Sequence, residues 1–74
     1  MRYTKDMILR DITHHSVFRT ALHIFRYDEM TVSVFHENPS NGSFVQHFMF
    51  AQPVNSKKDA ADFIESYLAK VGTR

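Results

Sequence analysis

Three runs of aromatic and β-branched residues follow one another in the middle of the chain, at positions 17–27, 30–37 and 43–51. Residues of this kind favour the pleated, half-buried surface of a β-sheet. The second connection between the runs, Asn38-Pro39-Ser40-Asn41-Gly42, combines a fixed proline φ with residues that accept a positive φ. Because strands joined by such short connections pair antiparallel, we expect a three-stranded antiparallel β-meander over residues 17–51.

The last part of the chain has the pattern of an amphipathic helix. Ser56 is suited to cap its N-terminus, and Asp59 three positions later completes a capping-box-like pair. Apolar residues then recur at helical spacing, at Ala60, Ile64, Tyr67, Leu68 and Val71. Gly72 stands where a left-handed C-terminal cap is expected. We therefore predict a helix over about 57–71, packed across one face of the sheet, and an α+β fold class.

The N-terminal segment, residues 1–16, leaves alternatives open. With Thr4 as the cap, residues from Lys5 to about Ile12 form a short helix on one or the other face of the sheet. Alternatively, the segment is a fourth strand or a loose arm. In each case the 74 residues are expected to form a single domain, made of the segment 1–16, the meander 17–51 and the helix 56–72.

The composition removes several classes of function. Cysteine is absent, which excludes disulfides, thiolate metal ligands and cysteine nucleophiles. The only glycines are Gly42 and Gly72, so the sequence has no glycine-rich phosphate loop. The spacing of a catalytic triad does not appear either. We therefore predict no enzyme activity, no catalytic residues and no cofactor.

The chain has nine Lys and Arg and eight Asp and Glu, for a net charge of +1. So small a net charge produces no strong electrostatic attraction to nucleic acid or to a membrane surface. The apolar run Met7-Ile8-Leu9 near the start is too short for a signal peptide or a membrane-spanning helix. We expect no membrane partner and a cytoplasmic location. One compositional oddity is that no residue between Glu37 and Lys57 is charged.

The hydrophobic pattern selects a register for the meander, because a slip of one residue moves every side chain to the other face. Pairing Tyr27 with Thr31, and Glu37 with Ser43, collects a strongly apolar face that can receive the C-terminal helix. That face carries Phe18, Leu22, Ile24, Val32, Val34, Phe44, Phe48 and Phe50. A two-residue Asp28-Glu29 loop would instead mix Phe and Val with Arg and Ser on both faces.

In this register the opposite face is also apolar. It carries Phe25, Phe35 and Met49 at its centre, with His23 and His47 beside them and Arg19 at the rim. A solvated antiparallel face is normally polar, and a bare apolar patch of this size exceeds what monomers usually expose. The N-terminal segment, a second copy in a homodimer or a different protein would cover it. We predict that these six residues bind a partner protein.

Histidine occurs five times, at positions 14, 15, 23, 36 and 47. In the expected register His23 and His47 share a face but lie on the two outer strands, more than roughly 9 Å apart. His36 points to the other side, and His14 and His15 precede the first strand. These positions do not converge on one ion, so we predict no metal site.

The order of a helix, three antiparallel strands and a C-terminal helix that opens with Ser56-Lys57-Lys58-Asp59-Ala60 resembles the double-stranded-RNA-binding domain over nearly the whole chain. In that family the basic pair at this helix start contacts phosphates across a groove. The family usually adds a third basic residue where this chain has Ala61. The resemblance implies, as the alternative function, RNA binding through Lys57 and Lys58.

The layout is also similar to that of some small phage proteins that inhibit host machinery, including anti-CRISPR proteins. These are a three-stranded meander followed by one helix with a serine or threonine cap, and the corresponding parts here are the Ile24-to-Glu37 meander, the uncharged third strand and the helix led by Ser56. The resemblance implies a stoichiometric blocker of a host complex such as a CRISPR effector. We accordingly predict a non-catalytic protein-binding module of the phage or prophage inhibitor or adaptor type.

Overall fold

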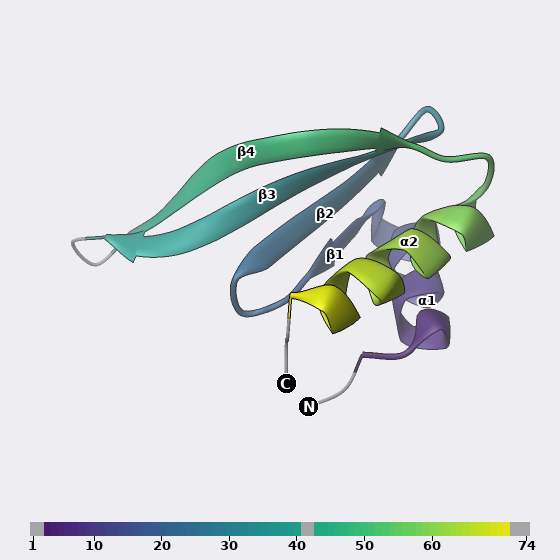
Figure 1. Ribbon diagram of the computed structural model, residues 1–74, viewed down its shortest axis with the longest axis horizontal. Coiled ribbons are helices and arrows are strands. Elements are labelled where there is room, and N and C mark those ends of the chain that lie inside the picture. The colour runs from purple at the N-terminus through teal and green to yellow at the C-terminus, as the bar shows by residue number, and fades with distance from the viewer. Residues whose placement is uncertain (1–2, 41–42, 72–74) are drawn as a thin grey trace.

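A four-stranded antiparallel sheet with two helices against one face accounts for the described residues, 3–40 and 43–71, of the computed structural model (Figure 1). The elements are α1 (Lys5–His15), β1 (Val17–Arg19), β2 (His23–Asp28), β3 (Thr31–Ser40), β4 (Ser43–Pro53) and α2 (Lys57–Lys70). The strands lie in sequence order, β1-β2-β3-β4, and each pairs antiparallel with the next. The predicted α+β class, antiparallel sheet and C-terminal helix are therefore confirmed.

The sheet has one strand more than the sequence predicted, because the run 17–27 breaks into β1 and β2. Thr20 makes the break: its backbone N–H donates to the carbonyl of His23, and its hydroxyl accepts from the backbone N–H of His23. These two bonds turn the chain, so that Phe18 pairs with Phe25. Sequence periodicity alone carries no sign of this side-chain-stabilised turn.

Both helices begin where a hydroxyl caps the first turn. Thr4 accepts a hydrogen bond from the backbone N–H of Met7, and Ser56 accepts one from that of Asp59. The N-terminal helix that the sequence left open is therefore formed, whereas the predicted cap at Gly72 lies outside the described residues. Within the described part of the chain, neither helix combines the length and the apolar composition that crossing a membrane requires.

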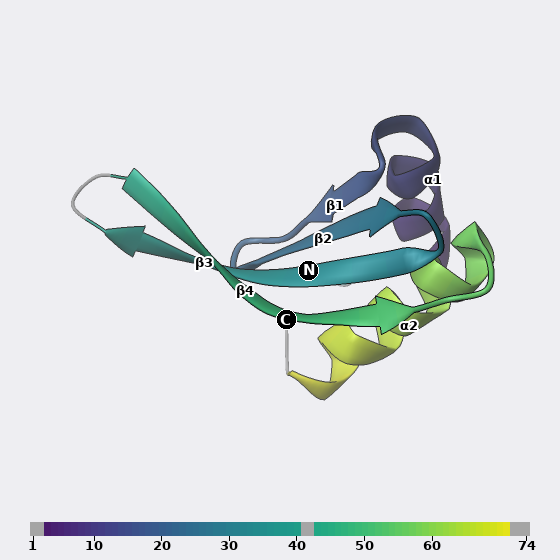
Figure 2. The same cartoon turned by 90° about the horizontal axis from the view of Figure 1, so that it is seen from above.

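The hydrophobic core lies between the helix pair and the sheet (Figure 2). Ile8 and Ile12 of α1 meet Ile64 and Leu68 of α2 over the strands. Two polar contacts fix the helices to each other: Lys5 Nζ lies 2.8 Å from Asp62 Oδ1, and the backbone N–H of Lys5 donates to Glu65 Oε2. The sheet residues of the core are Phe18, Phe25, Val32 and Val34, with Tyr27 and Phe50 partly buried beside them.

The register of the first hairpin differs by one residue from the prediction. Tyr27 pairs with Val32 and not with Thr31, and the connection is the two-residue turn Glu29-Met30. Both turn residues have positive φ, 44° and 62°, as the primed hairpin turns require. Those turns usually contain Asn or Gly, which is why this sequence did not indicate one. The consequence is that Phe25 pairs with Val34 and faces the helices.

The second hairpin also differs from the predicted register. Glu37 pairs with Gln46 and not with Ser43, and Phe48 pairs with Phe35 and not with Val32. A β-bulge interrupts the ladder, because the next pair along is Val34 with Phe50. The bulge leaves Met49 as an extra residue in β4, so that Phe48 and Phe50 lie on opposite faces although they are two positions apart.

The β3–β4 pair continues beyond the rest of the molecule. The backbone N–H of Glu37 still donates to the carbonyl of Leu22, just before β2. Beyond it, residues 38–40 and 43–45 pair only with each other. Figures 1 and 2 show this projecting hairpin extending away from both helices. The turn predicted over 38–42 is shorter in the structure, since Asn38, Pro39 and Ser40 belong to β3; Asn41 and Gly42 lie outside the described residues.

Candidate functional site

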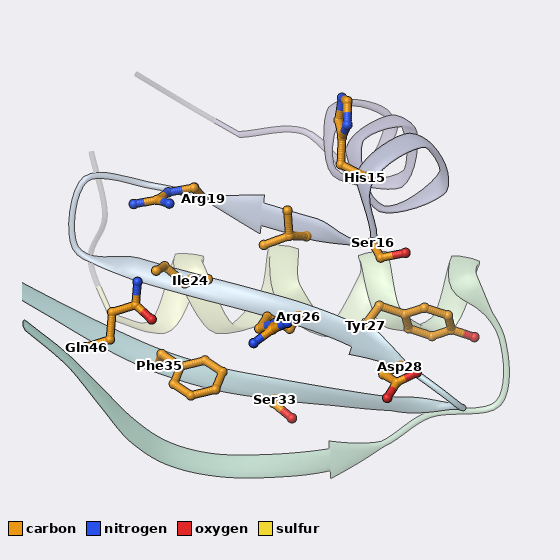
Figure 3. A pocket seen from close by; sticks show the side chains of 11 residues that line it. His15, Ser16, Arg19, Ile24, Arg26, Tyr27, Asp28, Ser33, Phe35 and Gln46 are labelled. Carbon is orange, nitrogen blue, oxygen red and sulfur yellow. The ribbon is translucent and has the colours of Figure 1, made fainter.

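The face of the sheet that the helices leave uncovered contains a shallow hollow of about 740 Å³ (Figure 3). All four strands contribute to its lining, with Arg19 from β1, Ile24 and Arg26 from β2, Phe35 from β3 and Gln46 from β4. Ile24 forms the floor, because it is only 4% exposed yet takes no part in the core beneath the helices. The hollow is therefore apolar at its floor and carries two guanidinium groups and the carboxylate of Asp28 at its margin.

Phe35, which lines the hollow, belongs to an aromatic pair. Phe35 and Phe48 pack edge to face, with ring centroids 5.6 Å apart. Phe48 is 59% exposed, more than any other large apolar side chain outside the segment 39–44 within the described residues. The predicted register placed Phe48 in the core, so sequence reasoning missed it. A two-residue Asn41-Gly42 loop, a strong primed-turn signal, would have placed Phe48 on the uncovered face.

The two arginines at the margin have different surroundings. Arg19 Nη2 donates to both carboxylate oxygens of Glu37, at 2.9 and 3.1 Å. Glu37 is buried, so this bond satisfies an acid that has little access to water. Arg26 is exposed and makes no ion pair among the residues that the structure describes. Its guanidinium is therefore available to an outside carboxylate.

The six residues predicted to share one partner-binding face do not lie together. Arg19 and Phe35 line the hollow, but Phe25 is fully buried in the helix-covered core and His23 is 7% exposed on that same side. Assigning Phe25 and His23 to the uncovered face was wrong, because the first hairpin turns one residue later than expected. Met49 also leaves that face: its sulfur accepts from the hydroxyl of Tyr67, on α2.

The corrected register brings three histidines into one row. His23 pairs with His36, and His36 pairs with His47, so all three lie on the helix side of neighbouring strands. The prediction that His36 points away from the other two was wrong.

The rings of His23 and His36 lie 5.2 Å apart, and the ring of Tyr67 is 5.7 Å from that of His23. Nδ1 of His23 is buried and has no hydrogen-bond partner in the structure. Burial, with a smaller contribution from the charge of His36, lowers the pKa of His23 below its ordinary value of 6.5.

The basic pair Lys57-Lys58 occupies the first turn of α2, and both side chains are exposed. The local structure of this turn is explained by its cap: Ser56 Oγ accepts from the backbone N–H of Asp59, while the Asp59 carboxylate accepts from the backbone N–H of Asn55. Neither lysine lines the hollow. The two candidate surfaces of this chain are therefore separate.

Comparison of the chain with family models, with curated proteins and with solved structures found no match in any of the three.

Proposed function

We propose that this protein is a non-catalytic protein-binding module whose contact surface is the open sheet face, defined by Arg19, Ile24, Arg26, Phe35, Gln46 and Phe48. The observation that carries the proposal is the exposure of Phe48 beside Phe35 on a face that no helix covers. An aromatic ring held against a second ring has its position fixed before binding. It therefore loses little conformational freedom when a partner covers it.

The composition of the open sheet face is typical of the energetic centre of an interface. Aromatic side chains and arginine are enriched there, and they contribute most when they lie around a pocket from which water is excluded. Here Phe35 lines the hollow with the ring of Phe48 packed against it, Ile24 forms the floor, and Arg19 and Arg26 stand at the margin. A protruding apolar side chain of the partner fits the hollow.

The charges of this face define the partner further. Arg19 is already bound to Glu37, whereas Arg26 is without an ion-pair partner among the described residues. We therefore expect a partner surface that places a carboxylate near Arg26 beside an apolar protrusion. The resemblance to small phage inhibitors, a three-stranded meander followed by one helix, covers β2, β3, β4 and α2 and leaves α1 and β1 outside it. For that part of the chain it supports stoichiometric blocking as the proposed mode of action.

Site-specific photo-crosslinking tests the proposal. A photoreactive residue at Ala51 reports on the open sheet face, because Ala51 is exposed and pairs with Ser33, which lines the hollow. The matched control is the same residue at Ala69, which is exposed on α2. In lysate of the organism that encodes the chain, we expect a discrete protein adduct from position 51 and none from position 69.

Phe48→Ser should remove the adduct at position 51 without changing the circular dichroism spectrum. An adduct that survives Phe48→Ser, or that forms equally at Ala69, would contradict the proposal. An adduct of twice the chain's own mass would show that the protein partner is a second copy.

RNA binding is the other outcome to be measured. A duplex RNA that binds with strong salt dependence and is lost in the Lys57→Ala/Lys58→Ala double variant would favour the double-stranded-RNA-binding alternative. A single-stranded RNA lost in Phe48→Ser would instead make the open sheet face a base-stacking platform. Either result, in the absence of a protein adduct, would replace the protein-binding proposal.

A further inference from the structure

The three histidines in a row offer chemistry that the open sheet face does not use, because they lie on the other side of the sheet. His23, His36 and His47 come from β2, β3 and β4 and are direct cross-strand neighbours. Neighbouring cross-strand residues have Cβ atoms roughly 5 Å apart and point to the same face. The row runs from the buried His23, through the half-buried His36, to the exposed His47 at the base of the projecting hairpin.

The spacing of the first two rings suits a shared metal ion. Zinc binds imidazole nitrogen at about 2.0–2.1 Å, so two imidazoles on one tetrahedral ion have ring centroids roughly 5 Å apart. The centroids of His23 and His36 are 5.2 Å apart, with the ring planes at 83°. This pair has the required separation without any movement of the backbone.

The state of His23 is a second, independent indication. Its Nδ1 is buried without a partner, which is uncommon for a buried polar atom and calls for a reason such as a bound ion. Tyr67 packs edge-on against the ring of His23 and holds it in position.

The third histidine would need a change of side-chain torsion to reach the same point. As the side chains lie, no three His, Asp or Glu residues within 3–40 and 43–71 converge on one position. His47 is exposed, and exposed rotamers interchange within nanoseconds. An imidazole holds a metal ion roughly 5 to 6 Å from its Cβ through Nε2 and roughly 3 to 4 Å through Nδ1. His47 bound through Nε2 and His23 bound through Nδ1 together span up to roughly 10 Å, which is about the separation of Cβ atoms on two strands that flank a central one.

We propose that His23, His36 and His47 form a binding site for a divalent transition-metal ion of the zinc type, with water as the remaining ligand. Imidazole nitrogen suits zinc, copper and nickel, and it disfavours calcium and magnesium, which prefer oxygen. A bound ion would link β2, β3 and β4 at the point where the β3–β4 pair leaves the body of the molecule. It would thereby fix the direction of the projecting hairpin.

Zinc titration of the full chain tests this site. The protein is freed of metal with EDTA, exchanged into buffer at pH 7.5 and titrated with zinc chloride in a calorimeter, with magnesium chloride as the hard-ion control. We expect one zinc per chain, at least tenfold weaker binding in His47→Gln and in His36→Gln, and no binding of magnesium. Zinc should also raise the unfolding temperature of the wild-type chain, since a ligand of the folded state stabilises it.

The matched control is the His14→Gln/His15→Gln double variant, which removes the exposed tandem pair at the end of α1. This variant should bind zinc as the wild type does. Loss of binding in the control, with retention in His47→Gln, would assign the zinc to the tandem pair and overturn the proposal. Absence of heat and of any change in unfolding temperature at 1 mM zinc would overturn it as well.

The fold of each variant is checked by circular dichroism in EDTA. Because His47 is exposed, His47→Gln keeps the test decisive even where His36→Gln perturbs the sheet. The nitrogen chemical shifts of the imidazole rings give a separate readout, because metal binding moves the resonances of the three ligands and leaves those of His14 and His15 unchanged.

Discussion

Arg19 and Glu37 are joined across the open sheet face by one guanidinium nitrogen that donates to both carboxylate oxygens, at 2.9 and 3.1 Å. Arg19 ends the short strand β1, whereas Glu37 lies where β3 passes beyond β2. The bond therefore connects the first strand of the sheet to the base of the projecting hairpin, across β2. Arg19 is also the only cationic residue that pairs with Glu37 among the described residues.

Removing the cation should destabilise the fold. Arg19→Ala leaves the buried Glu37 carboxylate without its donor, and we expect a loss of about 1–2 kcal/mol of unfolding free energy, toward the lower end for charged hydrogen bonds because Arg19 is half exposed. A double-mutant cycle with Glu37→Gln, followed by urea unfolding, measures the coupling. A coupling energy indistinguishable from zero would show that the pair contributes nothing to stability.

Two phenylalanines that sequence patterning assigned to the wrong faces should respond in opposite ways to truncation. Phe25→Ala should cost about 3–5 kcal/mol, because it opens a cavity among Phe18, Val34 and Tyr67 in the core. Phe48→Ala should cost less than about 1 kcal/mol, since its ring is mostly in water. Urea unfolding of the two variants compares them directly. Similar losses would contradict the face assignment of β4.

The turn Glu29-Met30 holds two non-glycine residues in the left-handed region, where each pays a steric cost. Replacing the pair with Asn-Gly should raise the unfolding free energy by about 1 kcal/mol, because these residues adopt the primed turn readily. Met30→Ala is the control, since it removes the same side chain and keeps the strain. Thermal unfolding gives the comparison, and an unchanged or lower midpoint for Asn-Gly would refute the prediction.

Stability should fall with acidification below the ordinary pKa of His23. The folded state lowers this pKa below 6.5, so the unfolded chain binds the proton that the folded chain excludes. By linkage, unfolding free energy is at its full value above pH 6.5, falls as the pH drops below it, and levels off below the folded pKa. The groups that face His23 are His36 from β3 and the rings of Phe25 and Tyr67.

Urea unfolding between pH 5 and 8 in the presence of EDTA measures this dependence without bound metal. His36→Gln should reduce the pH dependence without abolishing it, because it removes the smaller cause of the pKa shift and leaves the burial of His23 in place. His15→Gln, at an exposed position, should leave the pH dependence unchanged. A steeper fall in His36→Gln than in the wild type would contradict the assignment.

The parts of the fold that sequence could predict are those set by local chemistry. Ser56 and Asp59 define the start of α2, and the spacing of Ile64 and Leu68 defines its buried side; both are as expected. The register of the first hairpin could not be predicted from local chemistry. Its turn needs a positive φ at Glu29 and Met30, and neither glutamate nor methionine favours that conformation. Nor does the sequence around Thr20 indicate that the side chain of this residue stabilises a turn, which divides the first run into two strands.

Two register errors decided the candidate site. The one-residue error in the first hairpin moved Phe25 out of the core and separated His36 from His23. The three-residue error in the second hairpin, where Glu37 pairs with Gln46 and not with Ser43, put Phe48 into the core and separated His36 from His47. Arg19 and Phe35 were placed correctly on the uncovered face, because their side chains line the hollow. The histidine row could have been found from sequence only by testing the alternative two-residue turns against both strand pairs.

The extra residue in β4 has a consequence for how this chain can change over evolutionary time. In β4, the side chains of even-numbered residues before Met49 point away from the helices, and those after Met49 point toward them. A deletion of the Met49 codon would join Phe48 directly to Phe50 and restore the regular alternation of the strand, with both aromatics on their present faces. Met49 is therefore the position at which β4 can lose one residue without exchanging its solvent-facing and its sequestered aromatic.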